Sequence, residues 1–167
     1  GFQARAVREG RVAQRIAEKV LKDCGFRIVA KNRQLSGLGL EVNFIAEDQR
    51  GCKWYFDVSG TFTTPRAGLL RTDTLWKSLG HALVLTAKDK KPVVLLTTHL
   101  PKAKSAEDIA LHAVGWNKIF DAVEMYSAAG QRRLAHYAAG GFADSKPLPG
   151  FWTPEELLDM DHDRRVK

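Results

Sequence analysis

The spacing of hydrophobic residues predicts a chain in which helices and strands alternate. Between residues 6 and 24, apolar side chains recur every three to four positions, as in an amphipathic helix, and Gly25 is a typical helix stop. A second helix is predicted for residues 73–87, with Thr72 as its cap and with Leu75, Leu79 and Leu83 along one side. Two further helices are predicted for residues 105–114 and 128–139.

Strands are predicted where apolar and polar residues alternate, or where turn residues bound a short apolar run. Residues 40–47 and 53–59 alternate around the turn 48–51, which is the pattern of a β-hairpin with a core side and a polar side. The polar side carries Glu41, Asn43, Asp57 and Ser59, among others. Three more strands are predicted, one short, one buried and one at a sheet edge, over residues 26–30, 92–98 and 118–126. The segments 32–39 and 60–71 are predicted to be loops.

This order of elements predicts an α/β or α+β domain, with a mixed sheet flanked by helices on both faces. The chain has 167 residues, 44% of them hydrophobic and 27% charged, which fits one folded domain and excludes a wholly disordered chain. No apolar run approaches the ~20 residues that a membrane span needs, so no membrane partner is expected. The domain is predicted to cover residues 1–140. Prolines and glycines predict a linker and a short acidic helix over residues 141–167.

The positive charge is concentrated in two stretches. The net charge is +7, and residues 1–34 and 60–104 hold most of the excess of Lys and Arg. Such a distribution favours a polyanion such as DNA as partner, although a basic surface without a partner has the same composition. Cys24 and Cys52 are too few for a disulfide framework, so a cytoplasmic protein is expected. The first residue is not Met, so further domains of a larger protein are expected.

The order of helix, strand, hairpin with acids on one face, helix and strand resembles the PD-(D/E)XK superfamily of restriction-endonuclease-like nucleases. The matching stretches are residues 12–32, 41–46, 54–59 and the helix after Thr72. The family pattern has an acid in each hairpin strand and a Lys two residues after the second acid. In this chain those positions hold Asn43, Asp57 and Ser59, so only the second acid matches.

The resemblance implies a restriction-endonuclease-like fold and a DNA endonuclease that depends on Mg²⁺ or Mn²⁺, in a restriction-modification or phage-defence protein. Asp57, Asn43 and the carbonyl of Val58 would hold the metal ion, which polarises the phosphate and activates water. Several residues could replace the missing groups, and each has an alternative role as plain surface. They are Glu41 for the acid, Lys77 or Lys53 for the lysine, and Gln14 or Glu9 for a helix ligand, whereas Glu18 is expected at the surface.

The loop between the hairpin and the second helix is rich in hydroxyl and guanidinium groups, which contact phosphate oxygens in DNA complexes. The DNA-binding candidates are Thr61, Thr63, Arg66, Arg71 and Thr72. A polar surface loop before a capped helix would have the same composition.

A competing hypothesis is a catalytically inactive module of the same fold that binds DNA or a partner subunit. Asn43 and Ser59 favour it, because neither supplies the charge that the family pattern has at these positions. A third hypothesis is that Asn43 is an engineered replacement of an aspartate. Cleavage of both DNA strands would call for a homodimer.

Overall fold

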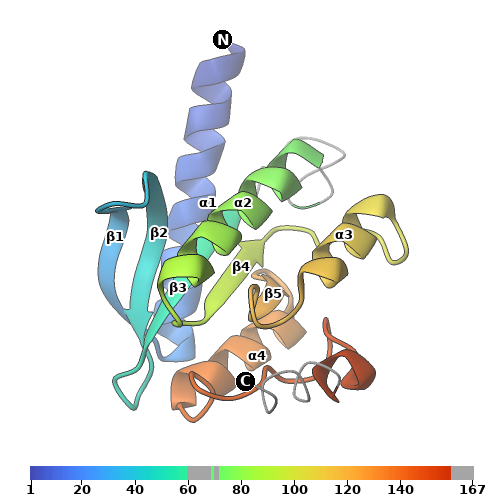
Figure 1. The fold of residues 1–167 in the computed structure, drawn as a ribbon. Coiled ribbons are helices and arrows are strands. Elements are labelled where there is room, and N and C mark those ends of the chain that lie inside the picture. The colour runs from blue at the N-terminus through green and yellow to red at the C-terminus, as the bar shows by residue number, and fades with distance from the viewer. Residues whose placement is uncertain (60–68, 70–71, 159–167) are drawn as a thin grey trace.

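A computed structural model describes residues 1–59, 69 and 72–158 of the chain (Figure 1). The order of elements is α1 (Phe2–Cys24), β1 (Arg27–Leu35), β2 (Leu40–Glu47), β3 (Lys53–Ser59), α2 (Thr72–Lys88), β4 (Val93–Thr97), α3 (Ala106–Val114), β5 (Asp121–Glu124) and α4 (Ala128–Ala139). The strands form one sheet in the order β1-β2-β3-β4-β5. The first three are antiparallel, and β3, β4 and β5 are parallel. The predicted α+β class and mixed sheet are therefore confirmed.

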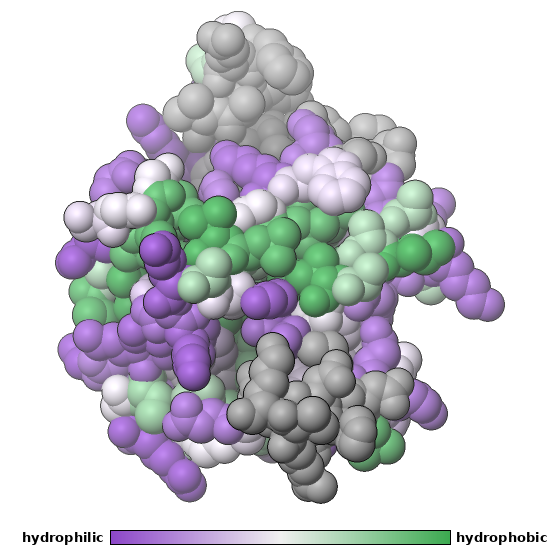
Figure 2. Space-filling view, in the orientation of Figure 1, coloured by the Kyte–Doolittle hydropathy of each residue, from purple (hydrophilic) through white to green (hydrophobic). Residues whose placement is uncertain are grey.

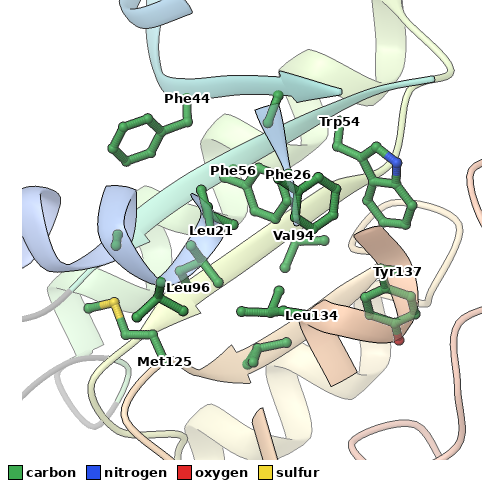
Figure 3. Packing of buried hydrophobic residues seen from close by; sticks show 14 of the residues in the cluster. Leu21, Phe26, Phe44, Trp54, Phe56, Val94, Leu96, Met125, Leu134 and Tyr137 are labelled. Carbon is green, nitrogen blue, oxygen red and sulfur yellow. The ribbon is translucent and has the colours of Figure 1, made fainter. Parts of the chain in front are cut away.

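Helices cover both faces of the sheet (Figure 1). One core lies under α1 and α4, where Ala17 and Leu21 of α1 and Leu134 of α4 pack on aromatic side chains of the strands. Figure 3 shows Phe44, Trp54 and Phe56 in this core. The second core lies under α2 and α3 on the opposite face, and includes the residues Tyr55, Leu75, Leu79, Leu95 and Leu111. Because side chains alternate along a strand, β3 sends Trp54 and Phe56 to one core and Tyr55 and Asp57 toward the other face.

The hairpin of β2 and β3 is held at its turn by Asp48. One carboxylate oxygen accepts hydrogen bonds from the backbone N–H groups of Arg50 and Cys52, at 2.9 and 3.0 Å, and the other accepts one from the indole of Trp54 at 3.0 Å. These bonds satisfy a carboxylate that is almost fully buried, which would otherwise be costly. The predicted bounds of both hairpin strands are confirmed.

The α2 helix crosses the sheet face on which Asp57 lies. Leu75, Leu79, Ala82 and Leu85 are buried, whereas Leu83 is 44% exposed, so the three leucines predicted along one side of the helix are not all buried. Eight residues rotate a helix by about 800°, so Leu83 points about 80° away from Leu75. Figure 2 shows a hydrophobic band on this face of the molecule, and Trp76, Leu83 and Val84 are exposed on α2.

Two strand predictions need correction. The β1 strand continues to Leu35, through residues predicted to be a loop, and its last residues pair with the start of β2, as in Gln34 with Glu41. Most of these residues are exposed, so no alternation marks them as a strand. The β5 strand is shorter than predicted and covers only Asp121–Glu124, because Ile119 belongs to a turn that bonds back to Gly115. Its predicted position at the sheet edge is confirmed.

The residues after α4 pack against the rest of the domain. Trp152 is fully buried, and its indole N–H donates to the carbonyl of Phe120 at 3.0 Å. A short helix follows at residues 154–158, where Thr153 and Glu156 cap each other reciprocally. None of the described helices combines the length and the apolar character needed to cross a lipid bilayer.

Candidate functional site

A cleft of about 660 Å³ opens at the end of β3, with β2 and the tip of the β1–β2 ribbon on one side and α2 on the other. Six predicted site residues line it, namely Glu41, Asn43, Asp57, Val58, Ser59 and Lys77. They come from three different elements. The structure therefore brings together candidates that the sequence places on both hairpin strands and on the following helix.

Asp57 lies on the floor of this cleft. The residue is 9% exposed and pairs with Leu95 of the neighbouring strand β4. Its Oδ1 lies 3.4 Å from Nδ1 of His81, which projects from α2. The interaction with Asp57 outweighs burial and raises the pKa of His81 above its usual value. Asp57 is thus nearly buried, yet its carboxylate faces a cleft with a titratable partner.

Asn43 lies at the point where β2 and β3 separate. The last regular pair of the two strands is Phe44 with Phe56. One step further, the side-chain oxygen of Asn43 accepts a hydrogen bond from the backbone N–H of Val58 at 2.8 Å. A carbonyl oxygen has a second lone pair, so this bond leaves room for one more donor or for a weak metal contact.

The remaining candidates differ in their exposure and in the hydrogen bonds that they form. Glu41 is exposed and receives a weak hydrogen bond of 3.4 Å from Gln34 across the ribbon. Ser59 is 7% exposed, and its Oγ has no hydrogen-bond partner within the described residues. Lys77 is exposed at the mouth, where its charge opposes protonation of His81.

The structure does not bring Gln14 to the cleft. Gln14 belongs to α1, which covers the opposite face of the sheet, and its side-chain amide donates to Asn32. It lines a separate surface hollow of about 350 Å³ beside Glu18 and Lys31. A role of Gln14 at the same metal ion as Asp57 is therefore incompatible with this fold.

Lys53 and Glu18 also lie away from the cleft. Lys53 is exposed and pairs with Glu47 next to the hairpin turn, at the opposite end of β3 from Ser59. Glu18 forms ion pairs with Lys22 and Lys31 and is a surface residue, as expected. The side chain of Glu9 lies outside the described residues.

The predicted DNA-binding residues cannot be placed in the cleft. Thr61, Thr63, Arg66 and Arg71 lie outside the described residues. Thr72 is the first residue of α2, so the helix begins at this residue rather than after it, and its side chain is likewise outside the described part.

Four lining residues on α2 were not predicted as site residues from the sequence, namely Asp73, Thr74, Ser78 and His81. Asp73, Lys77 and His81 are four residues apart, so they follow one side of the helix. This spacing is visible in the sequence, but a solvated stripe of a surface helix has the same spacing. Only the packing of α2 over β3 turns that stripe toward Asp57.

The charges of the cleft favour a cation. Among its described lining residues, Glu41, Asp57 and Asp73 carry carboxylates, and Lys77 is the one residue with a fixed positive charge. Within the described residues, no group of three or more His, Cys, Asp or Glu side chains is close enough to hold a metal ion by itself. Mg²⁺ in phosphate-processing sites is typically bound by one or two carboxylates, with water and phosphate oxygens completing its shell. The oxygen donors around Asp57 fit such a site.

Comparisons of the chain with protein-family models, with curated proteins and with solved structures find no match.

Proposed function

We propose that the chain is a metal-dependent DNA endonuclease domain that hydrolyses phosphodiester bonds in the cleft at the end of β3. The observation that carries the proposal is the meeting of Asp57, Asn43, Val58 and Lys77 in that cleft. The order of helix, three antiparallel strands, helix and parallel strand also agrees with the restriction-endonuclease-like resemblance. A biological setting in restriction-modification or phage defence rests on the resemblance alone.

The residues have distinct roles in this proposal. Asp57 would hold Mg²⁺ or Mn²⁺ together with the main-chain carbonyl of Val58 and the side-chain oxygen of Asn43. When bound, the cation supplies a Lewis acid for the phosphate and lowers the pKa of a water molecule. Lys77 would bind a non-bridging phosphate oxygen at the mouth and offset the charge that develops during hydrolysis. Glu41 would orient water from the side of the ribbon.

DNA is the proposed partner because of charge. The chain carries +7, and the excess is greatest in residues 1–34 and 60–104, which flank the strands β2 and β3. The described wall of the cleft is itself acidic, so a cation is needed there before a phosphate can approach Asp57. The basic residues would therefore attract DNA, and a cation in the cleft would allow a phosphate to approach Asp57.

The inactive binding module remains the second candidate, and one contact favours it. The oxygen of Asn43 is already used by the backbone of Val58, and Asn brings no charge to the cleft. Ser59 likewise brings no cation to the position at which the family pattern has a lysine. A site built this way would bind Mg²⁺ weakly.

Cleavage of supercoiled plasmid in Mg²⁺ or Mn²⁺ tests the proposal. We expect nicked and linear products from the wild type, none from Asp57→Asn, and wild-type cleavage from Asp23→Asn. Asp23 is a matched control because it is an exposed aspartate on α1, paired with Lys19. Salt-dependent DNA binding without cleavage, even by Asn43→Asp, would establish the binding module instead. Absence of DNA binding at low salt would contradict both.

A further inference from the structure

The contact between Asp57 and His81 has an unusual length for a charged hydrogen bond. The two atoms, Oδ1 and Nδ1, are 3.4 Å apart, whereas charge-assisted hydrogen bonds to carboxylates are about 2.7–2.9 Å long. The side chains retain 12% and 29% of their exposure, so solvent and ions can reach the pair from the cleft. The two groups therefore lie opposite each other but do not form a short hydrogen bond.

This separation is that of two ligands on one metal ion. Carboxylate oxygen and imidazole nitrogen bind Zn²⁺ at about 2.0–2.2 Å, which places two ligands of a tetrahedral ion about 3.4 Å apart. We infer that His81 and Asp57 together bind a first-row transition-metal ion in the cleft, and that the imidazole makes the site prefer Mn²⁺ to Mg²⁺. The inference rests on the proposed function, since the ion is the one proposed there for Asp57.

The preference follows from ligand chemistry. Mg²⁺ is a hard cation that favours oxygen ligands and keeps several waters, so an imidazole nitrogen adds little to its binding. First-row transition-metal ions accept imidazole more readily, and their affinity for nitrogen ligands rises from Mn²⁺ to Cu²⁺ and is lower again for Zn²⁺. A His81 ligand in place of an oxygen ligand therefore strengthens the binding of transition-metal ions but adds little to the binding of Mg²⁺.

Ser59 provides an independent indication of a ligand at this place. It follows Asp57 by two residues on β3, lines the same cleft and is more than nine-tenths buried. Its Oγ lacks a hydrogen-bond partner within the described residues, and a buried hydroxyl left this way is costly. A metal ion, or a water molecule bound to one, would satisfy it.

Lys77 adds a positive charge to the same cleft. It precedes His81 by one helical turn, and its charge acts on the imidazole. Because Lys77 is exposed, water screens this repulsion.

The test measures Mn²⁺ binding directly, by loss of the electron paramagnetic resonance signal of free Mn²⁺, with Mg²⁺ as competitor. We expect wild-type protein to bind Mn²⁺ about tenfold or more tighter than Mg²⁺. His81→Ala and His81→Gln should each weaken Mn²⁺ binding about tenfold, in the range seen for altered metal sites, and change Mg²⁺ binding less than threefold. His136→Ala is the control, because His136 is an exposed histidine on α4, away from the cleft. Circular dichroism establishes that each variant is folded.

The outcomes separate this inference from the proposed nuclease. Mn²⁺ binding that depends on His81 without any DNA cleavage supports the metal site and overturns the nuclease. Mg²⁺-dependent cleavage that requires Asp57, together with Mn²⁺ binding unchanged in both His81 variants, overturns the metal site and leaves the nuclease. Equal wild-type affinity for both cations, or no binding of either, also overturns the inference.

Discussion

The side chain of Asn43 accepts a hydrogen bond from the backbone N–H of Val58 at 2.8 Å, one step beyond the last regular pair of β2 and β3. A side chain here replaces the backbone partner that a continued ladder would supply. The bond ties the end of β3 to β2 and so holds Asp57 at the floor of the cleft. Asn43 therefore has a structural role that any catalytic hypothesis has to include.

We predict that Asn43→Ala destabilises the fold. The substitution leaves the N–H of Val58 without its acceptor in a partly buried position, and such losses cost about 1–2 kcal/mol. Denaturant unfolding of the two proteins measures the difference. Asn117→Ala, at an exposed loop asparagine, should change stability by less than about 0.5 kcal/mol. Equal effects of both substitutions would contradict the structural role.

We predict that Asn43→Asp makes the stability of the fold depend on divalent cations. An aspartate can accept the same hydrogen bond with one oxygen, and its charge adds to that of Asp57 in the cleft. Repulsion between the carboxylates lowers the unfolding midpoint in the absence of divalent cations. Addition of Mg²⁺ should then raise the midpoint of the variant more than that of the wild type, because binding to the native state stabilises it. Thermal unfolding with and without Mg²⁺ checks this, and identical shifts would refute it.

Lys77→Met should reduce the salt dependence of DNA binding. If Lys77 binds one phosphate at the mouth of the cleft, its loss lowers the slope of log K against log salt by about 0.9. Fluorescence anisotropy of a labelled duplex at several salt concentrations measures the slope. Lys53→Met serves as the control, since Lys53 is an exposed lysine outside both basic stretches and lies at the opposite end of β3 from the cleft. A slope that falls equally in both variants would show that Lys77 has no specific phosphate contact.

The parts of the fold that could be predicted from the sequence are those in which apolar residues recur at a regular spacing or form a continuous run. The hairpin strands alternate, so their bounds and faces follow from the sequence, and with them the common side of Asn43 and Asp57. The extension of β1 to Leu35 could not be predicted in this way, because its residues are exposed on both faces. That segment is a strand only because it pairs with β2.

The site was harder to predict than the fold, because side chains from different elements meet through packing. His81 carries no signal of its own in the sequence, and it reaches Asp57 because Leu75 and Leu79 bury the adjacent side of α2. Gln14 matches a position in the family pattern, but α1 packs on the face opposite to Asp57. Periodicity shows which side of a helix is buried, but it does not show which face of the sheet receives that side.

We predict that Asp121→Asn is strongly destabilising. The fully buried carboxylate accepts two hydrogen bonds from the guanidinium of Arg133, at 2.7 and 3.0 Å, and one from the hydroxyl of Tyr137 at 2.6 Å. Arg133 also donates to the carbonyls of Leu148 and Pro149, so the network attaches the segment after α4. Removal of one member of a buried ion pair costs about 3–5 kcal/mol.

Denaturant unfolding measures this cost. Tyr137→Phe is the informative companion, because it removes one hydrogen bond and leaves the ion pair, with an expected loss of about 1–2 kcal/mol. Equal losses in the two variants would mean that the charge of Asp121 contributes nothing beyond its bond to Tyr137.

The short helix at residues 154–158 is attached to α3 through an ionisable pair, His112 and Glu156. The imidazole of His112 lies 2.9 Å from a carboxylate oxygen of Glu156 and stacks on Phe151, with ring centroids 4.2 Å apart. Burial acts to raise the pKa of Glu156, but the bonds from the backbone of Thr153 and from His112 together hold it below its usual value. A carboxyl whose pKa is lower in the folded state stabilises the fold above its unfolded pKa, and that contribution is lost as the pH falls through the folded pKa.

We therefore expect the wild type to lose more stability than Glu156→Gln as the pH is lowered from neutral to below about 4.5, the ordinary pKa of a glutamate. Denaturant unfolding at a series of pH values measures the two curves. Glu155→Gln is the matched control, because Glu155 is exposed on the same short helix. The loss of stability with falling pH should be as steep in that control as in the wild type. Parallel curves for the wild type and Glu156→Gln would contradict the role of Glu156, because the ionised carboxylate would then contribute nothing to the docking of the helix on His112.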